Sequence, residues 1–264
     1  MTVDVVTVVL APPDPCVPAV RWAARAASRR RAPLRIVVPA TGSPAQRRTW
    51  LRAALTRSRR AAPRIVVTPV LSDEGDDRAA RIAAADAAVL VVPGGSPAVP
   101  GLLRSVTCPL VVVPAGWAGR DTGPVLLAVG PSTSDTAVAF AFAEAERSGS
   151  DLLAVHVRHG RSDPLDGLDD RLGLAVAAFP DVTVRTDVAD ERCEAHLTRL
   201  ATDARLLVMG RSARGVLLDR LLPSPTRLVA GLARCPVAVV PGEDGPVRAS
   251  LLPEHGVRMA DLLR

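Results

Sequence analysis

The chain contains an internal duplication, and this feature limits the folds open to it more than any other. The segment Thr107-Cys-Pro-Leu-Val-Val-Val-Pro114 recurs as Arg234-Cys-Pro-Val-Ala-Val-Val-Pro241. Three further pairs keep the same order: VVTVVLAP from Val5 with VLLAVGPS from Val125, PLRIVVP from Pro33 with SDLLAVHV from Ser150, and DAAVLVVP from Asp86 with DARLLVMG from Asp203. Repetition of this extent predicts one structural unit present twice within 264 residues.

Each half alternates short runs of Val, Leu and Ala with longer alanine-rich segments, which indicates strands joined by helices. The strands expected in the second half lie at 125–130, 151–157, 181–187, 205–210 and 236–240. Their nearly continuous apolar character is typical of a parallel sheet covered on both faces. Three apolar stripes at helical spacing predict the covering helices: Val138, Ala141, Phe142 and Ala145; Leu165, Leu168 and Leu172; and Leu197, Leu200, Ala201 and Ala204. The predicted fold class is α/β, with two tandem doubly wound parallel five-stranded sheets.

The predicted boundaries place the first domain at 1–116 and the second at 123–242, with a short linker between them. A tail over 243–264 ends in a short amphipathic pattern, GVRMADLLR, that is typical of a helix. The last strand of each half is expected at a sheet edge, where backbone amides lack a partner. We therefore predict antiparallel pairing of 109–113 with 236–240 inside one chain, and a homodimer is left open.

Composition excludes several classes of protein. No apolar run approaches the ~20 residues that cross a bilayer, and the first residues include an acid where a secretory signal would be basic. A cytoplasmic protein without a membrane association is expected. The four cysteines form no C-x-x-C pair, so reduced and mostly buried thiols are expected.

The net charge of +6 by itself suggests a polyanion as a partner. However, the chain has no lysine, and its richness in arginine, alanine and proline is typical of a GC-rich genome. Three Trp, three Phe and no Tyr leave few side chains on which the bases of a single strand could stack. Nucleic-acid binding is therefore expected to be absent, and arginine-driven polyanion binding is kept as a third hypothesis.

The halves differ after the fourth strand, at the edge where open α/β sheets bind ligands. Asp86 and Asp203 are offset by 117 residues, whereas Cys108 and Cys235 are offset by 127, so the second half carries ten extra residues. The insertion lies between 210 and 226. Within it, Ser224 is a good helix N-cap, and the backbone amides that follow favour an anion.

The chain resembles the universal stress protein family in its tandem two-domain form. The resemblance rests on VLLAVGPSTSDTAVAFAFAEA, VVTVVLAPPDPCVPAVRWAARAA, the Leu-Ala-Val-His-Val of the second strand, and VMGRSARG followed by CPVAVVP. It covers nearly everything from Val3 to Val240. It implies a strand order of 3-2-1-4-5, pairing of domains through the fifth strand and, in some members, ATP bound by a G-x2-G-x9-G-[ST] pattern.

The nucleotide-binding pattern is only partly present in this chain. Gly210 occupies its first position and Ser224 its last, but Ala213 and Pro223 replace the second and third glycines. By resemblance, Gly210 and Ser224 lie at the phosphates and Val157 lies near the base.

Two further features bear on the strength of such a site. The acidic residue usual at the end of the first strand is replaced by Gly130 in the second half and by Leu10 in the first. Guanidinium groups can bind phosphate in place of lost amides, and the loop supplies four arginines, namely Arg211, Arg214, Arg220 and Arg227. The alternative is that these arginines form a solvated face and that the loop binds nothing.

Other candidate sites are weaker. Cys193 and His196 are three residues apart on an expected helix, but no second pair completes a metal site. His156 is expected to be a hydrogen-bonded core histidine, and no catalytic constellation is found. The leading hypothesis is a non-enzymatic, metal-free stress-response or regulatory module that binds ATP or another adenine nucleotide weakly, in the second half only. The competing hypothesis is a ligand-free scaffold that acts through protein–protein association.

Overall fold

Short runs of β-branched and other apolar residues form the strands in both halves of the chain. The computed structural model describes residues 4–11, 17–130, 133–157, 168–189, 193–211 and 233–242. It divides into two units, residues 1–120 and 121–264. The relative placement of these units is not determined, so the expected pairing of 109–113 with 236–240 stays a prediction, as do the domain boundaries 1–116 and 123–242. The expected helix of the tail, 243–264, lies outside the described residues.

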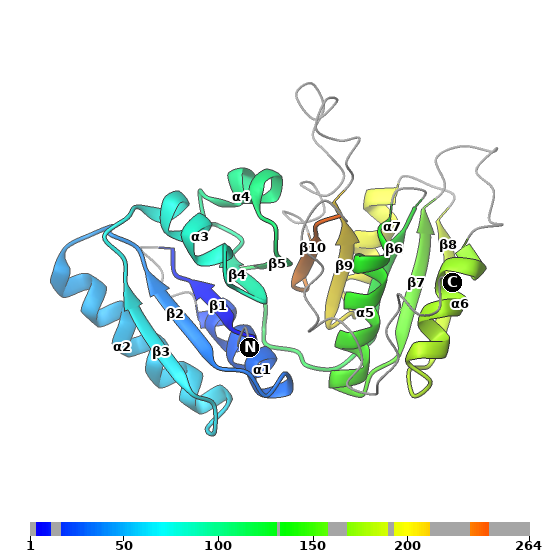
Figure 1. Ribbon diagram of the computed structural model, residues 1–264, viewed down its shortest axis with the longest axis horizontal. Helices are drawn as coiled ribbons and strands as arrows, with labels where there is room; N and C mark the ends of the chain where they lie inside the picture. Colours follow the sequence, from blue (N-terminus) through cyan, green and yellow to red (C-terminus); the bar gives the residue numbers. More distant parts are fainter. Residues whose placement is uncertain are drawn as a thin grey trace. The chain divides into compact units, whose positions relative to one another are not determined.

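The N-terminal unit is a five-stranded sheet in the order β3-β2-β1-β4-β5, and every neighbouring pair is parallel (Figure 1). Its elements are β1 (Val6–Val9), α1 (Val17–Arg29), β2 (Leu34–Val38), α2 (Pro44–Ala61), β3 (Val67–Leu71), α3 (Asp76–Ala84), β4 (Val89–Pro93), α4 (Val99–Ser105) and β5 (Leu110–Val113).

The C-terminal unit repeats this topology in the order β10-β9-β6-β7-β8, again with parallel neighbours. Its elements are β6 (Val125–Val129), α5 (Asp135–Ser148), β7 (Leu152–Val157), α6 (Leu168–Ala178), β8 (Val184–Ala189), α7 (Cys193–Leu200), β9 (Leu206–Gly210) and β10 (Val237–Val240). The predicted fold class, with strand order 3-2-1-4-5 in each half, is confirmed.

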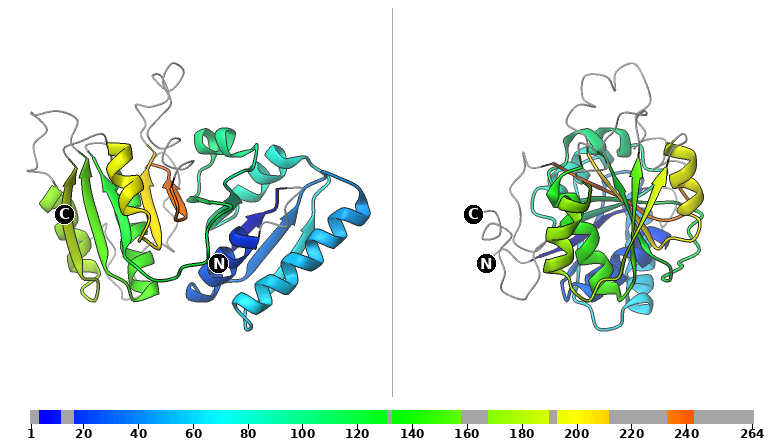
Figure 2. Two further views of the ribbon diagram at one scale, coloured as in Figure 1. Left: turned by 180° about the vertical axis from the view of Figure 1, so that it is seen from behind. Right: turned by 90° about the vertical axis from the view of Figure 1, so that its right-hand side faces the viewer.

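Helices cover both faces of each sheet, as right-handed crossovers require. In the N-terminal unit, α1 packs beside α2 on one face and α3 beside α4 on the other (Figure 2). In the C-terminal unit, α5 and α6 pack together on one face, and α7 lies on the opposite face. The chain therefore changes face after the third strand of each unit, and the crossover that follows adds β4 or β9 on the free side of the first strand.

The core of the C-terminal unit is centred on α5. The predicted stripe of four apolar residues is buried, and burial extends over every residue from 137 to 145. Alanines let the helix approach the sheet closely, while Phe142 fills the space toward α6. Its ring lies 5.7 Å from the ring of Phe179, and both side chains are at most 1% exposed. One aromatic pair therefore joins the central helix to the end of its neighbour.

One predicted strand was placed three residues too early in the chain. The pattern predicted a strand over 181–187, but β8 begins at Val184. The residues before it form a turn in which the Val182 amide donates to the Phe179 carbonyl at 3.1 Å. Val182 is apolar and is buried although it belongs to this turn. Its hydrophobicity was therefore misread as the start of the strand.

The segment between the two sheets is held by arginines. Arg25 Nη1 donates to the Gly119 carbonyl at 2.8 Å, and Arg21 Nη1 donates to the Ala118 carbonyl at 3.2 Å. Two residues further on, Asp121 pairs with Arg205 at 2.9 Å. Each end of the predicted linker is thus tied to its own unit.

The cysteines that can be described agree with the expected buried thiols. Cys108 and Cys235 form no disulfide bond, and each is at most 2% exposed. Burial raises the pKa of the Cys235 thiol to about 12, so the reactive thiolate is suppressed near neutral pH. Both residues begin the segment that leads into the last strand of their unit, where they act as small apolar side chains.

Candidate functional site

The C-terminal unit has a topological switch point at the carboxyl ends of β6 and β9. Strand β6 pairs with β7 on one side and with β9 on the other, so the strand order reverses at β6: one neighbour is the next strand in the chain, and the other follows only after two further strands. Ligands of open α/β sheets bind beyond the strands at such a point. The residues that follow β6 and β9 therefore form the candidate site.

Gly210 ends β9 and lies against the beginning of α5. A Cβ added there would lie 3.6 Å from the Thr133 Cα and 3.7 Å from the Ser134 backbone nitrogen, which is van der Waals contact. Ser134 is the N-cap of α5, and its hydroxyl accepts a hydrogen bond from the Ala137 amide. The structure thus places the predicted phosphate glycine beside a helix N-terminus, where backbone amides point outward.

Gly130 follows β6 at the same edge. Its amide donates to the Thr133 hydroxyl at 2.9 Å, which closes a short turn before α5. A Cβ added at Gly130 meets no atom within 4 Å, so a longer side chain has room there. This is the position at which the family resemblance leads one to expect an acidic residue.

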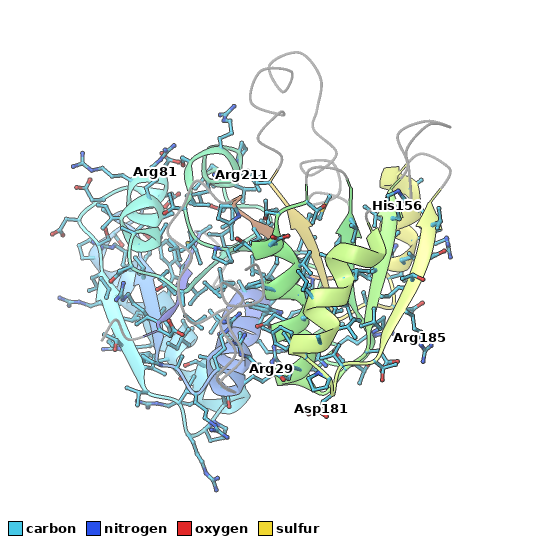
Figure 3. The ribbon with its side chains drawn as sticks, turned by 45° about the vertical axis from the view of Figure 1, so that its right-hand side comes forward. Arg29, Arg81, His156, Asp181, Arg185 and Arg211 are labelled. Carbon is cyan, nitrogen blue, oxygen red and sulfur yellow. The ribbon has the colours of Figure 1, made fainter. Side chains whose placement is uncertain are left out.

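The end of β7 supplies the third part of the edge. Val157, the residue predicted near the base, is the last residue of β7, and His156 precedes it. His156 pairs in register with Val129, the last residue of β6, so it reaches the same edge of the sheet (Figure 3). Its side chain is 4% exposed, yet neither ring nitrogen has a hydrogen-bond partner within the described structure. The core position expected for this histidine is confirmed, but its expected hydrogen bond is not found among the described residues.

The remaining predicted site residues lie outside the described residues. They are Ser224, with Ala213, Pro223, Arg214, Arg220 and Arg227. Arg211, the last described residue before them, donates its backbone amide to the Val240 carbonyl at 2.7 Å. The structure therefore brings Gly210, Gly130 and the end of β7 to one edge of the sheet, and the predicted contact of Ser224 with phosphate stays a prediction.

The N-terminal unit has larger side chains at the corresponding edge of its sheet. Leu10 stands where the other unit has Gly130 and is 2% exposed, and Ala11 beside it is also buried. Pro93 ends β4 where Gly210 ends β9. Gly94 then lies close to the last strand, because a Cβ there would meet the Val113 carbonyl oxygen at 3.4 Å. Larger side chains thus occupy both positions that are glycine in the C-terminal unit.

Sequence reasoning missed a histidine–carboxylate pair near the outer strand of the C-terminal unit. His196 Nε2 lies 3.0 Å from Asp187 Oδ2, and Arg199 lies 3.4 Å from the other ring nitrogen. The hydrogen bond from His196 lowers the pKa of Asp187. In the part of the chain that the structure describes, no three His, Cys, Asp or Glu side chains could hold a metal ion. A pairing between a strand and the following helix depends on tertiary packing, so the sequence carried no direct signal for it.

The Asp187 pair makes the unfolding free energy depend on pH. Its lowered pKa means that the folded state stabilises the charged carboxylate. The wild-type protein is therefore expected to be more stable than Asp187→Asn above the ordinary aspartate pKa of about 4, and to lose this advantage as the pH falls through the lowered pKa. Because the carboxylate is largely solvated, the difference should stay below about 1 kcal/mol. Urea unfolding of both proteins at several pH values measures it, and a difference that grows at acidic pH would contradict the assignment.

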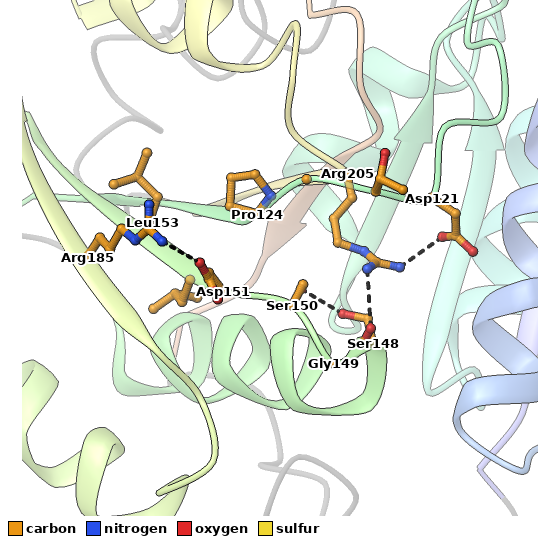
Figure 4. A pocket seen from close by; sticks show the side chains of 12 residues that line it. Asp121, Pro124, Ser148, Gly149, Ser150, Asp151, Leu153, Arg185 and Arg205 are labelled. Carbon is orange, nitrogen blue, oxygen red and sulfur yellow. Dashed lines mark hydrogen bonds and ion pairs between the residues drawn. The ribbon is translucent and has the colours of Figure 1, made fainter.

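A cavity of about 500 Å³ lies at the opposite, amino-terminal edge of the same sheet (Figure 4). Arg205 enters it with its guanidinium held by Asp121 and, at 3.4 Å, by the Ser148 carbonyl. Arg185 is paired with Asp151 at 3.0 Å. Since both cations already have carboxylate partners, this cavity has little capacity to attract an anion. It also lies away from the strand ends at which α/β sheets bind ligands.

No helix among the described residues has the length and apolar character needed to cross a bilayer. The fold and the candidate site together define a class: a tandem α/β protein made of two doubly wound units, of which the second has glycines at 130 and 210 at its switch point.

Comparison with known proteins agrees with this class. Residues 169–241 match the model of the universal stress protein family. The universal stress protein Rv2623 of Mycobacterium tuberculosis is 29% identical over 282 aligned residues, which cover 84% of this chain and 91% of that protein. Universal stress protein Rv2005c of the same species is 34% identical over 159 residues, about half of each chain (52% and 53%).

A solved structure supports the fold independently. The universal stress protein from Archaeoglobus fulgidus superimposes with a TM-score of 0.61 at 15% identity, over 90% of this chain and 97% of that chain. Together, the comparisons show that this chain is similar in sequence to universal stress proteins and that it shares its fold with one of them.

Proposed function

We propose that this protein is a non-catalytic stress-response or regulatory module whose C-terminal unit binds an adenine nucleotide, such as ATP, weakly. The site consists of Gly210 and Ser224 at the phosphates and of Val157 near the base. The observation that carries the proposal is the contrast between the units. At the switch point the C-terminal unit has glycines at 130 and 210, where the N-terminal unit has Leu10 and Pro93.

The weakness of binding follows from what the site lacks. A hydrogen bond to a charged group contributes about 1.5 to 3 kcal/mol, so the absence of an acidic residue at Gly130 costs roughly ten- to a hundred-fold in affinity. Pro223 also removes one backbone N–H from the loop that the resemblance places at phosphate. The arginines of the loop offset part of this loss, because guanidinium groups bind phosphate bidentately.

The proposal assigns no catalytic role to the His196–Asp187 pair. The His196–Asp187 pair belongs to α7 and β8, and β7 separates β8 from the β6 end of the switch point. A general base must come within hydrogen-bond reach of the proton that it removes. The pair therefore lies one strand further from Gly130 than His156 and Val157 do.

Replacing Gly130 by aspartate should strengthen ATP binding by about ten- to a hundred-fold, because it supplies the missing charge-assisted hydrogen bond. The open space around Gly130 allows the substitution without a clash. Isothermal titration calorimetry of the wild-type protein and Gly130→Asp with ATP measures the change. Gly95→Asp is the matched control, since it adds the same charge in the N-terminal unit at a glycine whose Cβ also meets nothing.

Unchanged affinity in Gly130→Asp, or equal gains in both variants, would contradict the proposed placement of the base. If neither protein binds ATP at millimolar concentration, nucleotide binding is rejected and the ligand-free scaffold becomes the better explanation.

A further inference from the structure

The net charge of +6 is divided very unevenly between the two units. Residues 1–120 contain 17 arginines and 7 acidic residues, a net charge of +10. Residues 121–264 contain 16 arginines and 20 acidic residues, a net charge of −4. Opposite charge on two homologous units indicates different electrostatic partners.

The positive charge of the N-terminal unit is concentrated in one segment. Between Asp14 and Asp73 the chain has 13 arginines and no acidic residue. A GC-rich genome explains arginine in place of lysine, but it does not explain the removal of Asp and Glu from 58 consecutive residues. Genome composition therefore does not explain the high positive charge of this segment.

The fold brings much of this segment onto one face, because α1 and α2 pack side by side on the same side of the sheet. We call the arginines that are exposed on α2 and after the two helices the basic face: Arg31, Arg48, Arg52, Arg59, Arg60 and Arg64. Within the described structure none of these six makes an ion pair or a side-chain hydrogen bond. By contrast, Arg47 is half-buried and donates to the carbonyls of Val38 and Ser72, so it anchors α2 to the sheet.

Three members of the basic face form a row. Arg48, Arg52 and Arg59 are spaced by four and seven residues, so they lie within about 40° of one another around the helix. The rise of the helix separates them by about 6 Å and about 10 Å along its axis. Flexible side chains on such a row can reach several phosphates of one backbone at once.

Structural roles do not account for the basic face. Arg59 and Arg60 lie in the last turn of α2, where the helix dipole favours cations, but Arg48 and Arg52 lie in its first half, where it does not. Like charges at i and i+4, such as Arg48 and Arg52, destabilise a helix slightly. An external anion would relieve this repulsion.

The chemistry of the surface favours one class of anion. A membrane-bound helix presents apolar side chains beside its basic ones, but the exposed large apolar residues of the N-terminal unit, Val66, Leu71 and Ile82, lie outside α1 and α2. Trp50 is half-buried and packs against Gly42, so it offers no stacking platform or protein-interface anchor. A surface with guanidinium groups alone matches a phosphate backbone.

We propose that the basic face, which is carried by α2 and by the residues that follow α1 and α2, binds the phosphate backbone of a nucleic acid duplex without sequence preference. This extends the function beyond the nucleotide proposed above, and it resides in the other unit, so either proposal can fail alone. It also revises the expectation, drawn from composition, that nucleic-acid binding is absent.

Fluorescence anisotropy with a labelled DNA duplex of about 25 base pairs tests the proposal over about 0.05 to 0.3 M salt. The wild-type protein should bind with a slope of log K against log salt of about −3 to −5. The quadruple variant R48Q/R52Q/R59Q/R60Q should bind about 100-fold more weakly at 0.1 M salt, with a slope flatter by about 3.

The matched control is R78Q/R81Q/R104Q/R120Q, which removes four exposed arginines of the same unit outside the basic face. It should stay within about fivefold of wild type, because these arginines lie outside the basic face and two of them, Arg78 and Arg81, are already paired with Glu74 and Asp77. Circular dichroism should show both variants folded, since all eight side chains are exposed.

Equal losses in the two variants would overturn the proposal, because net charge and not the basic face would then control binding. The absence of salt-dependent duplex binding by the wild-type protein would also overturn it. Binding only to vesicles of phosphatidylcholine and phosphatidylglycerol would assign the surface to a membrane instead.

Discussion

Replacing Gly123 by alanine is expected to lower the unfolding free energy of the C-terminal unit by about 3 kcal/mol or more. Gly123 has a φ of +94°, which alanine rarely adopts. A Cβ there would lie 2.0 Å from the Asp203 carbonyl oxygen. This oxygen belongs to the backbone, so it cannot rotate away as a side chain can. Either the residues that lead into β6 or the turn before β9 must therefore move. Urea unfolding followed by circular dichroism measures the loss.

Gly149→Ala separates the two causes of this loss. Gly149 also has a positive φ, +58°, as the left-handed residue that ends α5. A Cβ there meets nothing within 4 Å, so only conformational strain remains, about 1 to 2 kcal/mol. If Gly123→Ala costs no more than this control, then the close approach to Asp203 does not constrain the fold.

Replacing Phe142 by alanine is expected to cost about 3 to 5 kcal/mol. The side chain is fully buried, and it is the link between α5 and the end of α6 through Phe179. Its removal leaves a cavity that neighbouring alanines are too short to fill. Phe142→Leu keeps most of the volume and should cost about 1 kcal/mol.

The position of the tryptophans makes this measurement selective. Trp22, Trp50 and Trp117 all belong to the N-terminal unit, so tryptophan fluorescence reports that unit alone, whereas circular dichroism reports both. The loss in Phe142→Ala should be seen by circular dichroism. A cost below about 1.5 kcal/mol would mean that the core around α5 collapses to fill the space.

The fold was predictable because its evidence is local and repeated. Strand runs such as VLVVP and LLVMG are apolar throughout, which identifies strands that are covered on both faces. The error at 181–187 arose because Val182 is buried by a turn and not by a strand. Apolar character reports burial, and it does not by itself report which backbone conformation is buried.

The candidate site was predictable only in part. Gly210 and Gly130 were identified by their places in a pattern, and the structure places both at the switch point. The unsatisfied ring of His156 and the pair of His196 with Asp187 were not foreseen, because each depends on how neighbouring elements pack. Similarly, the arginines could be counted in the sequence, but their collection onto one face required α1 and α2 to lie side by side.

By itself, the sequence determined that the protein consists of two copies of a doubly wound α/β unit, because periodicity and repetition are properties of the chain. The tertiary structure decided that Gly130 and Gly210 lie at the switch point of the second copy, and that the arginines of the basic face have no ion pair among the described residues. These outcomes depend on the space around single residues, such as Gly130 against Leu10, and on the distance between the described carboxylates and the basic face. Such distances join residues far apart in the chain, and only folding sets them.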